Sequence, residues 1–440
     1  MDLKKLNCII VLLKTEEEEN MKEFNRVIGY DDVKIELERI IDMMINSEKY
    51  KALGVQTTRG LLLHGDPGVG KTLMAKCFIK ASKRHAFTVR KDLPDGDFVK
   101  FIKNTFEKAK KEAPSIVFLD DMDKFANEDS DHRNAEEFVT IQSCIDECKD
   151  DEVFVLATTN DLDAIPRSLL RPGRFDKSIV IDNPEGSDAE KIIKHYLKKK
   201  KCGKDVDAKE VSRLLNGKSC AALETVINEA GVYAGYENRK ELSMNDLVRA
   251  FMRVVYKAPE KLKFKDNKYL LQTAYHEAGH AVVAETLEPG SVPFVTVKPH
   301  DGGKQGFARL DNNDNYFEDK QFMENRVISL LAGKAATEIV YGITDVGANS
   351  DIRRAFDIVE RFVDDYCTYG FNTFEGISHK EPEYLEQSRA TIVAYEMERY
   401  YLQAKKIIIE NRNYLDSVAN ALYNKKVLLA KDIQDLNPIN

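Results

Sequence analysis

The residues from Gly65 to Thr72 have the spacing of a loop that binds phosphate groups. Their order, Gly-Asp-Pro-Gly-Val-Gly-Lys-Thr, fits GxxxxGK[ST], directly after a short apolar strand at 59–64 and before a helix expected over 71–82. Glycines let backbone N–H groups face phosphate oxygens at the positive end of that helix, and this context favours a nucleotide site over a glycine-rich turn without a ligand. Lys71 would reach the β- and γ-phosphates, and the Thr72 hydroxyl would bind Mg²⁺. The expected binding residues of this loop are Asp66, Pro67, Gly68, Val69, Gly70, Lys71, Thr72 and Leu73.

Two carboxylates follow a second apolar strand, in the run Ile116-Val-Phe-Leu-Asp-Asp121. We expect Asp120 to hold Mg²⁺ through a water molecule and Asp121 to polarise the water that attacks the terminal phosphate. A third strand ends in Thr158-Thr-Asn160, and the amide of Asn160 can help to position the same water.

Arg171 and Arg174 lie three residues apart in the turn Leu170-Arg-Pro-Gly-Arg-Phe-Asp176. Arginines held by a rigid Pro-Gly turn can enter the γ-phosphate site of a neighbouring subunit. The alternative for both is ordinary ion pairing on the surface.

A second kind of chemistry is indicated by His276-Glu-Ala-Gly-His280, which fits HExxH. Two histidines four apart on a helix share a face and can bind one zinc ion, and Glu277 is placed to take a proton from zinc-bound water. A core helix with two hydrogen-bonded histidines is the alternative. A hydrolytic zinc site needs a third protein ligand. The residues alone do not choose among four acidic candidates: Glu338, Asp345, Asp351 and Asp357.

The elements that position these residues form two patterns. Short apolar strands at 59–64, 115–119 and 153–157, the last two rich in β-branched residues, alternate with helices such as 71–82 and 97–113, which predicts a parallel sheet covered on both faces. The chain is all-helical from about 187 to 256, charged and linker-like at 257–266, and then mostly helical with a strand-like interlude at 292–310.

The 440 residues are 43% hydrophobic and 32% charged, which is enough for several cores. A net charge of −8 makes nucleic acid an improbable partner. The longest apolar run, Leu6–Leu13, is too short to cross a membrane and favours a buried strand over a signal-peptide core, so we expect a soluble, cytoplasmic chain that does not bind membranes. Seven scattered cysteines fit a reducing compartment, and Cys144 and Cys148 favour packing over half of a metal site.

The order of phosphate loop, Asp120-Asp121, Ala157-Thr-Thr-Asn160 and Leu170–Asp176 resembles the AAA+ ATPases, and with HExxH it resembles the FtsH-like zinc metalloproteases. The resemblance implies an α/β ATPase domain, a helical lid, a homo-oligomeric ring, usually of six subunits, and a mostly helical peptidase. It also implies one Zn²⁺ per subunit, ATP and Mg²⁺ as cofactors and proteins as substrates. The expected segments are 1–23 (N-terminal), 24–186 (ATPase), 187–257 (lid), 258–268 (linker) and 269–440 (peptidase).

The same resemblance assigns further residues. Val27-Ile28-Gly29 is similar to the segment that contacts adenine, and the helix with Ala221-Ala-Leu-Glu224 is similar to the lid helix that faces the nucleotide. The segment Val346–Asp351 resembles the stretch that supplies the third zinc ligand, here Asp351, and Glu338 lies where an acid could support the ligands. The implied function is ATP-dependent degradation of unfolded or tagged proteins.

The chain departs from the family in four ways. It shows no membrane segments before the ATPase, and Asp121 stands where the family has glutamate, which predicts slow ATP hydrolysis. Asp66 replaces a frequent proline and should point outward. The segment that normally carries a substrate-gripping aromatic residue is short, so Phe98 or Phe101 either grips substrate or belongs to a helix core. Two alternatives therefore stay open: a nucleotide-gated peptidase with little translocation, and a remodelling ATPase whose peptidase site is inactive.

Overall fold

The computed structural model describes residues 22–92, 94–126, 135–260, 267–299, 306–309, 319–343, 346–370 and 383–438. It divides into two compact units: the chain up to Ala208 with Leu215–Ser243, and Lys209–Leu214 with the chain from Met244 onward. The strand expected at Leu6–Leu13 lies outside the described residues, as do parts of the expected linker and of the strand-like interlude.

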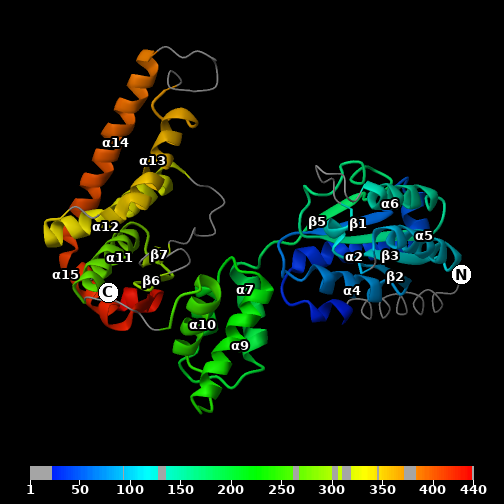
Figure 1. Cartoon of the computed structure of the whole chain (residues 1–440), viewed down its shortest axis with the longest axis horizontal. Helices are drawn as coiled ribbons and strands as arrows, with labels where there is room; N and C mark the ends of the chain where they lie inside the picture. The colour runs from blue at the N-terminus through cyan, green and yellow to red at the C-terminus, as the bar shows by residue number, and fades with distance from the viewer. Residues whose placement is uncertain are drawn as a thin grey trace, which may run out of the picture. The chain divides into compact units, whose positions relative to one another are not determined.

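The first unit is built on a five-stranded sheet in the order β2-β3-β4-β1-β5, with every neighbouring pair parallel (Figure 1). Strands β3 and β4 are buried along their whole lengths, as expected of a parallel sheet covered on both faces. The strands are β1 (Gly60–His64), β2 (His85–Val89), β3 (Ser115–Leu119), β4 (Val153–Thr159) and β5 (Lys177–Val180). The predicted α/β fold is confirmed.

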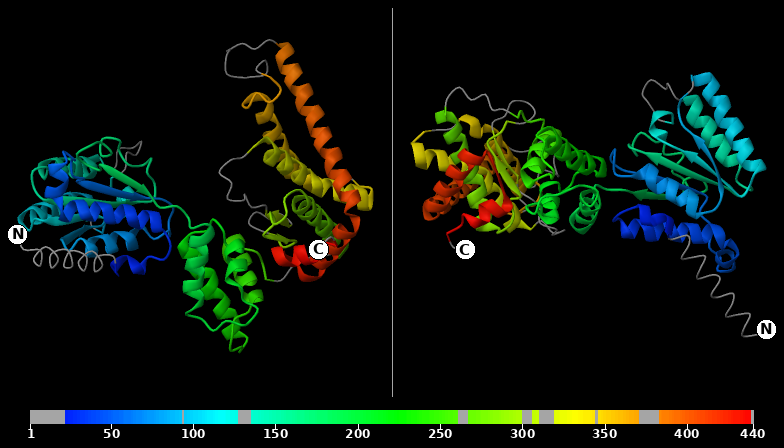
Figure 2. Two further views of the ribbon diagram at one scale, coloured as in Figure 1. Left: turned by 180° about the vertical axis from the view of Figure 1, so that it is seen from behind. Right: turned by 90° about the horizontal axis from the view of Figure 1, so that it is seen from below.

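Helices cover the two faces of this sheet (Figure 2). One face packs against α4, where Phe78 meets Phe154 of β4 with ring centroids 5.5 Å apart, and the other packs against α5 and α6. The helical elements up to the end of the sheet are η1 (Glu23–Arg26), α2 (Asp31–Ile45), α3 (Ser47–Ala52), α4 (Lys71–Ala81), α5 (Asp95–Lys111), η2 (Met122–Lys124) and α6 (Ala135–Glu147).

Helix α5 contains the two phenylalanines that could have gripped substrate. Phe98 is 0% exposed, and its ring lies edge-on to Phe125 at 5.2 Å between centroids. Phe101 is half-buried and packs against the same core. With Ile102 and Phe106 also buried, Phe98 belongs to the apolar face of an amphipathic helix, so the helix-core alternative is the correct one for Phe98.

Four helices follow the sheet in the region expected to form a lid. By their packing, α7 and α9 group with the first unit, and α8 and α10 with the second. Helix α9 begins after Ser219, whose side chain accepts a hydrogen bond from the N–H of Ala222, as an N-cap does. The helices are α7 (Gly186–Leu197), α8 (Ala208–Leu214), α9 (Cys220–Tyr236) and α10 (Met244–Tyr256). The expected boundaries of a separate lid at 187–257 stay a prediction.

The second unit is mostly helical with a small antiparallel sheet in the order β7-β6-β8 (Figures 1 and 2). Its central helix α11 is apolar on most sides, and Ala274, Ala278 and Val282 are fully buried. The helices are α11 (Asn267–Leu287), α12 (Lys320–Tyr341), η3 (Val346–Ala348), α13 (Asn349–Asp364), α14 (Glu383–Glu410), α15 (Arg412–Lys425) and α16 (Ala430–Asp435). The strands are β6 (Phe294–Thr296), β7 (Phe307–Arg309) and β8 (Val427–Leu429).

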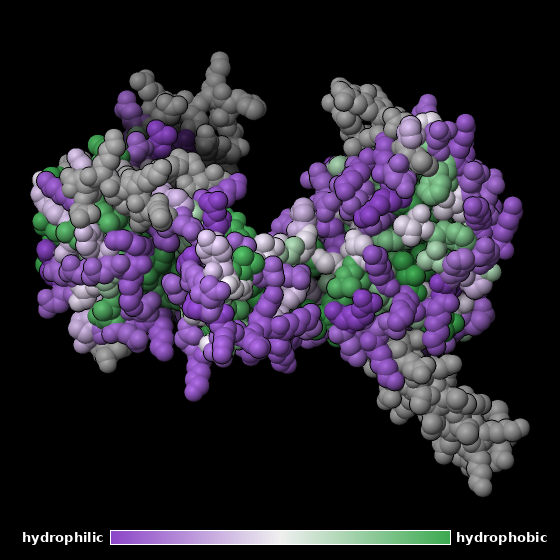
Figure 3. Space-filling model, turned by 60° about the horizontal axis from the view of Figure 1, so that its bottom comes forward, coloured by the Kyte–Doolittle hydropathy of each residue, from purple (hydrophilic) through white to green (hydrophobic). Residues whose placement is uncertain are grey.

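In the part of the chain that the structure describes, every helix is too short or too polar to cross a lipid bilayer. Hydrophilic residues prevail on the face shown in Figure 3. Cys144 and Cys148 are buried on α6, and burial raises the pKa of each thiol to about 11, which favours neutral packing residues over metal-binding thiolates.

The buried position of Phe98 predicts a stability effect. Phe98→Ala should lower the free energy of unfolding of the first unit by about 3–5 kcal/mol, because it leaves a cavity in the core. Phe101→Ala, at a half-buried site, should cost less. Urea denaturation followed by circular dichroism measures both. A Phe98→Ala protein that is as stable as the wild type, yet no longer degrades a folded substrate, would assign Phe98 to substrate gripping instead.

Candidate functional site

The phosphate loop lies between β1 and α4, where the sequence predicts it. Its three glycines, Gly65, Gly68 and Gly70, have φ angles of +144°, +84° and +107°, which other residues rarely adopt. Lys71 starts α4, and its Nζ donates to the carbonyls of Gly65 and Asp66 at 2.7 and 2.8 Å. The ammonium group therefore lies within the curl that would receive the phosphates, and burial lowers the pKa of Lys71.

Asp66 is exposed, and its Oδ2 accepts a hydrogen bond from Asn183 Nδ2, outside the loop, at 2.8 Å.

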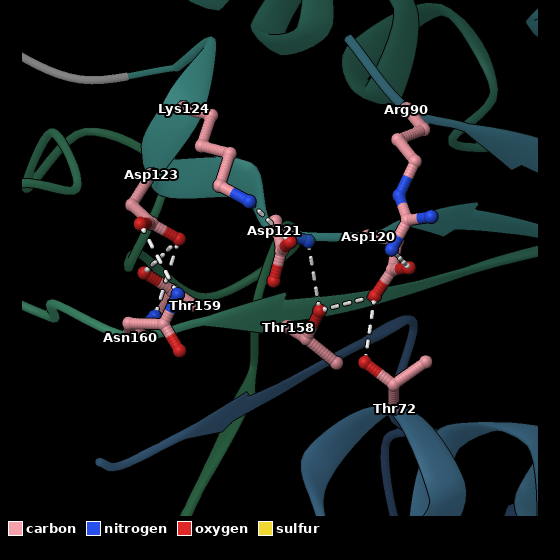
Figure 4. Close-up of polar contacts among 9 residues, drawn as sticks. All are labelled: Thr72, Arg90, Asp120, Asp121, Asp123, Lys124, Thr158, Thr159 and Asn160. Carbon is pink, nitrogen blue, oxygen red and sulfur yellow. Dashed lines mark hydrogen bonds and ion pairs between the residues drawn. The ribbon is translucent and has the colours of Figure 1, made fainter. Parts of the chain in front are cut away.

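Asp120 lies at the end of β3, beside the phosphate loop (Figure 4). The residue is 4% exposed, and its Oδ1 accepts hydrogen bonds from the hydroxyls of Thr72 and Thr158, both at 3.0 Å. Arg90 Nη2 lies 3.0 Å from the other oxygen, Oδ2. The structure thus brings together Thr72 and Asp120, the two residues expected to hold Mg²⁺.

Asp121 occupies a left-handed conformation with φ +56°. Its N–H donates a hydrogen bond to Thr158 Oγ1 at 2.9 Å, and its Oδ2 accepts one from Lys124 Nζ at 2.6 Å (Figure 4). The residue expected to activate water is thus held by a lysine from the next turn of chain.

A third carboxylate, Asp123, lies beside Asn160. It accepts hydrogen bonds from the Asn160 backbone N–H at 3.2 Å, from Asn160 Nδ2 at 3.4 Å and from Thr159 Oγ1 at 3.3 Å. This orients the amide so that Asn160 Oδ1 points away from Asp123 (Figure 4). The sequence reasoning did not include Asp123, although its place two residues after the paired acids was the available signal.

Segments far apart in sequence meet on the other side of the loop. Gly29 lies against Asp188, whose carboxylate accepts from the N–H of Tyr30 at 2.9 Å, and the Tyr30 hydroxyl lies 3.5 Å from Cys220 Sγ. The first turn of α9 reaches the loop itself, because the N–H of Ala221 donates to the carbonyl of Gly68 at 3.0 Å. The predicted lid helix therefore contacts the phosphate loop, and Tyr30, the residue after the predicted adenine segment Ile28-Gly29, lies beside the first residue of that helix.

The two arginines of the Pro-Gly turn differ. Arg171 is exposed, whereas Arg174 binds both carboxylate oxygens of Asp146 at 3.0 and 2.7 Å. Within one chain, Arg174 thus shows the surface ion pairing named as the alternative. A contact of either arginine with a neighbouring subunit stays a prediction.

The two histidines of HExxH meet Asp351 as the zinc hypothesis requires. The Nε2 atoms of His276 and His280 are 3.1 Å apart, and Asp351 Oδ2 lies 3.5 and 3.7 Å from them. Among the described residues, these three form the one group of His, Cys, Asp or Glu side chains close enough to hold a metal ion. Burial alone would raise the pKa of Asp351, but the two neighbouring imidazoles lower it overall, so the carboxylate is ionised.

The other acids that the sequence left open lie elsewhere. Asp357 is exposed on α13, and Asp345 is outside the described residues. Glu338 binds Lys405 Nζ at 2.6 Å, Tyr401 and Lys334, and these contacts lower its pKa to about 2. The expectation that Glu338 supports the metal ligands is therefore not met, because its described contacts tie α12 to α14.

The histidine pair is shaped to receive zinc. His280 Nδ1 lies 2.7 Å from the carbonyl of Ser329, so Nδ1 carries the proton and Nε2 keeps a lone pair for a metal. A Cβ atom at Gly333 on α12 would lie 2.4 Å from His280 Nε2 and 2.7 Å from His276 Nε2. The absence of a side chain at Gly333 thus keeps the ligand atoms clear, and two imidazoles with one carboxylate are a donor set that suits zinc.

A second glycine lies against the expected base. Glu277 is 4% exposed, and a Cβ atom at Gly306, which has φ +66°, would lie 2.8 Å from its Oε1. Gly306 therefore lets the start of β7 pass beside the carboxylate of Glu277. The sequence reasoning missed both glycines, and for Gly333 the signal was a glycine in the middle of a helical pattern.

A phosphate loop with paired acids at a parallel sheet, joined to a two-histidine, one-aspartate centre on helices, defines a nucleoside triphosphatase coupled to a zinc peptidase. The comparisons with known proteins agree. The family described as "ATPase family associated with various cellular activities (AAA)" matches residues 61–183, and "Peptidase family M41" matches residues 263–436.

The chain also aligns along nearly its whole length with named relatives. The ATP-dependent zinc metalloprotease FtsH of Bacillus subtilis is 30% identical over 96% of this chain and 71% of the relative, and that of Caldicellulosiruptor bescii is 31% identical over 94% and 71%. The alignment with FtsH 2 of Phytoplasma mali, at 30% identity, covers 62% of that protein. This chain belongs to the FtsH family of ATP-dependent zinc metalloproteases. The predicted fold, the enzyme class and the cofactors Zn²⁺, ATP and Mg²⁺ are thereby confirmed.

The space at Gly333 yields a prediction about metal affinity. Gly333→Ala should weaken zinc binding by at least about 10-fold, because the added methyl group meets the Nε2 atoms. Zinc content after equilibration with a competing chelator measures the effect. Gly231→Ala, on α9 with open space around the added atom, is the control and should leave zinc unchanged while slightly stabilising its helix. Full zinc affinity in the Gly333→Ala protein would contradict this account of the site.

Proposed function

We propose that His276, His280 and Asp351 hold the zinc ion and that Glu277 is the general base of peptide hydrolysis. The convergence of these side chains around the space left by Gly333 carries the proposal. Bound zinc would polarise a water molecule and the scissile carbonyl. Glu277 accepts the proton of the attacking water and returns it to the departing amine nitrogen. Its burial excludes bulk water from that transfer.

In the nucleotide site, we assign Mg²⁺ binding to Thr72 and Asp120, and contact with the β- and γ-phosphates to Lys71. Lys71 must exchange the carbonyls of Gly65 and Asp66 for phosphate oxygens. Asp121 polarises the attacking water, and Asn160, with its Nδ2 on Asp123, keeps Oδ1 for the same water. Ile28 and Gly29 contact the adenine, opposite the first turn of α9.

As partners, we propose protein substrates and further copies of the chain, arranged as a ring of six. Arg171 is exposed, and Arg174 would leave Asp146 to approach the γ-phosphate of the next subunit. The described cysteines are free, which fits the proposed place in a reducing cytoplasm.

Two observations favour the nucleotide-gated peptidase as a second candidate. Phe98, a possible gripping residue, is fully buried. Asp121 is both shorter than glutamate and held by Lys124 at 2.6 Å. Binding of ATP would then order the assembly while hydrolysis stays slow and pulls little substrate. The fit of the histidine pair to zinc speaks against the remodelling ATPase without a working peptidase.

The peptidase assignment is tested by Glu277→Gln. This variant should keep its zinc but cleave casein about 10²–10⁴-fold more slowly, because the proton acceptor is lost. His276→Ala should lose the zinc as well. Metal content and casein cleavage are measured on the same preparations, with ATP present. Residual cleavage equal to that of the wild type would sink the protease mechanism.

The nucleotide assignment is tested by lengthening the acid. Asp121→Glu should raise the rate of ATP hydrolysis by up to about 10²-fold, since it moves the carboxylate one methylene closer to the water. Steady-state phosphate release measures this, and Lys71→Ala is the inactive control. Wild-type turnover no higher than that of Lys71→Ala would show that Asp121 does not serve as the base. An Asp121→Glu rate equal to the wild-type rate would show that its length is not the limit.

A further inference from the structure

Arg90 follows β2 and reaches the acid expected to hold magnesium. Its side chain is 61% exposed, whereas that of Asp120 is 6% exposed, and Nη2 lies 3.0 Å from Asp120 Oδ2 (Figure 4). A guanidinium group stays charged at any physiological pH, so this contact places a permanent cation on a nearly buried carboxylate.

The two oxygens of Asp120 are not equivalent. Oδ1 accepts from the hydroxyls of Thr72 and Thr158. The Thr72 hydroxyl can keep donating its hydrogen to Oδ1 while a lone pair of its oxygen binds Mg²⁺. The oxygen left for the water shell of the metal is therefore Oδ2, which Arg90 contacts.

We infer that Arg90 is a positioning residue that competes with the water shell of Mg²⁺ for Asp120 Oδ2 and so sets how strongly nucleotide binding depends on magnesium. Without the metal, Arg90 compensates the charge of Asp120 and holds its carboxylate in place. With the metal, the guanidinium yields Oδ2 and, being exposed, is free to turn toward solvent or phosphate. The inference rests on the proposed role of Asp120 at the nucleotide site.

The neighbouring acid, Asp121, pairs with a different cation, so the contact of Arg90 is specific to Asp120. Lys124 binds Asp121, and both residues lie in the same turn, three residues apart. Arg90 instead follows a different strand, β2, and the ion pair that the structure records for it is with Asp120, the proposed metal-binding acid of the pair.

The experiment measures binding of a fluorescent, ribose-labelled ATP analogue to the full chain while the concentration of Mg²⁺ is raised from zero. Arg90→Gln should lower the Mg²⁺ concentration at half-maximal binding by about two- to fivefold, the range expected for loss of an exposed ion pair that opposes the metal. Arg90→Lys, which keeps the charge, should stay close to the wild type. Lys100→Gln removes another exposed positive charge, 3.9 Å from Asp97 on α5, and should cause no shift. Thermal unfolding confirms that each variant is folded.

The outcomes separate this inference from the proposed function. If the wild type does not bind the analogue at any Mg²⁺ concentration, the nucleotide site itself is wrong. If the wild type binds and Arg90→Gln shows the same Mg²⁺ dependence, only the competition is wrong. A rise in the half-maximal Mg²⁺ concentration would overturn it too, because Arg90 would then assist the metal.

Discussion

The close approach of α11 and α12 determines the chemistry of the second unit. A Cβ atom at Gly279 would lie 2.7 Å from the carbonyl of Ala332, so this glycine lets the two helices touch backbone to backbone. The same contact brings the Ser329 carbonyl to His280 and Gly333 to both imidazoles. A larger residue at either glycine would separate the helices and the ligands together. The catalytic geometry thus depends on packing at backbone distance more than on the loops around it.

In the first unit, the corresponding constraint is the negative charge of neighbouring carboxylates. Three carboxylates, Asp120, Asp121 and Asp123, follow one strand at the edge where parallel strands end. Carboxylates this close to each other and partly removed from water need donors or cations. Threonine hydroxyls, an asparagine amide, Arg90 and Lys124 supply them. The charges of these carboxylates are therefore already compensated before a magnesium nucleotide binds. Its binding replaces some of these hydrogen bonds and ion pairs with contacts to the metal and the nucleotide.

Much of the fold and of the two candidate sites could be predicted from the sequence because the informative signals are local. The phosphate loop, the acids after an apolar strand and HExxH each occupy a few consecutive residues. The residues by themselves did not select Asp351, because the segments from β6 to η3 separate it from the histidines in sequence; only the family resemblance did. Gly333 and Arg90 were missed for the same reason. The residues next to them in sequence do not indicate that Gly333 lies against the two histidines or that Arg90 contacts Asp120. Phe98 was ambiguous because an aromatic residue in the first turn of a helix can face either solvent or core, and its burial and contact with Phe125 decide.

Helices α9 and α10 follow one another in sequence but belong to different units. Helix α9, grouped with the first unit, hydrogen-bonds to the phosphate loop through Ala221, and α10, grouped with the second, packs Phe251 edge-on to Phe294 of β6 at 5.1 Å. Only residues 237–243 join these two helices. Strand β6 in turn pairs with β7, and Gly306, the residue before β7, lies beside Glu277, the proposed base. Two helices that follow one another in sequence are therefore anchored beside different candidate sites, α9 at the phosphate loop and α10 at the small sheet that adjoins Glu277.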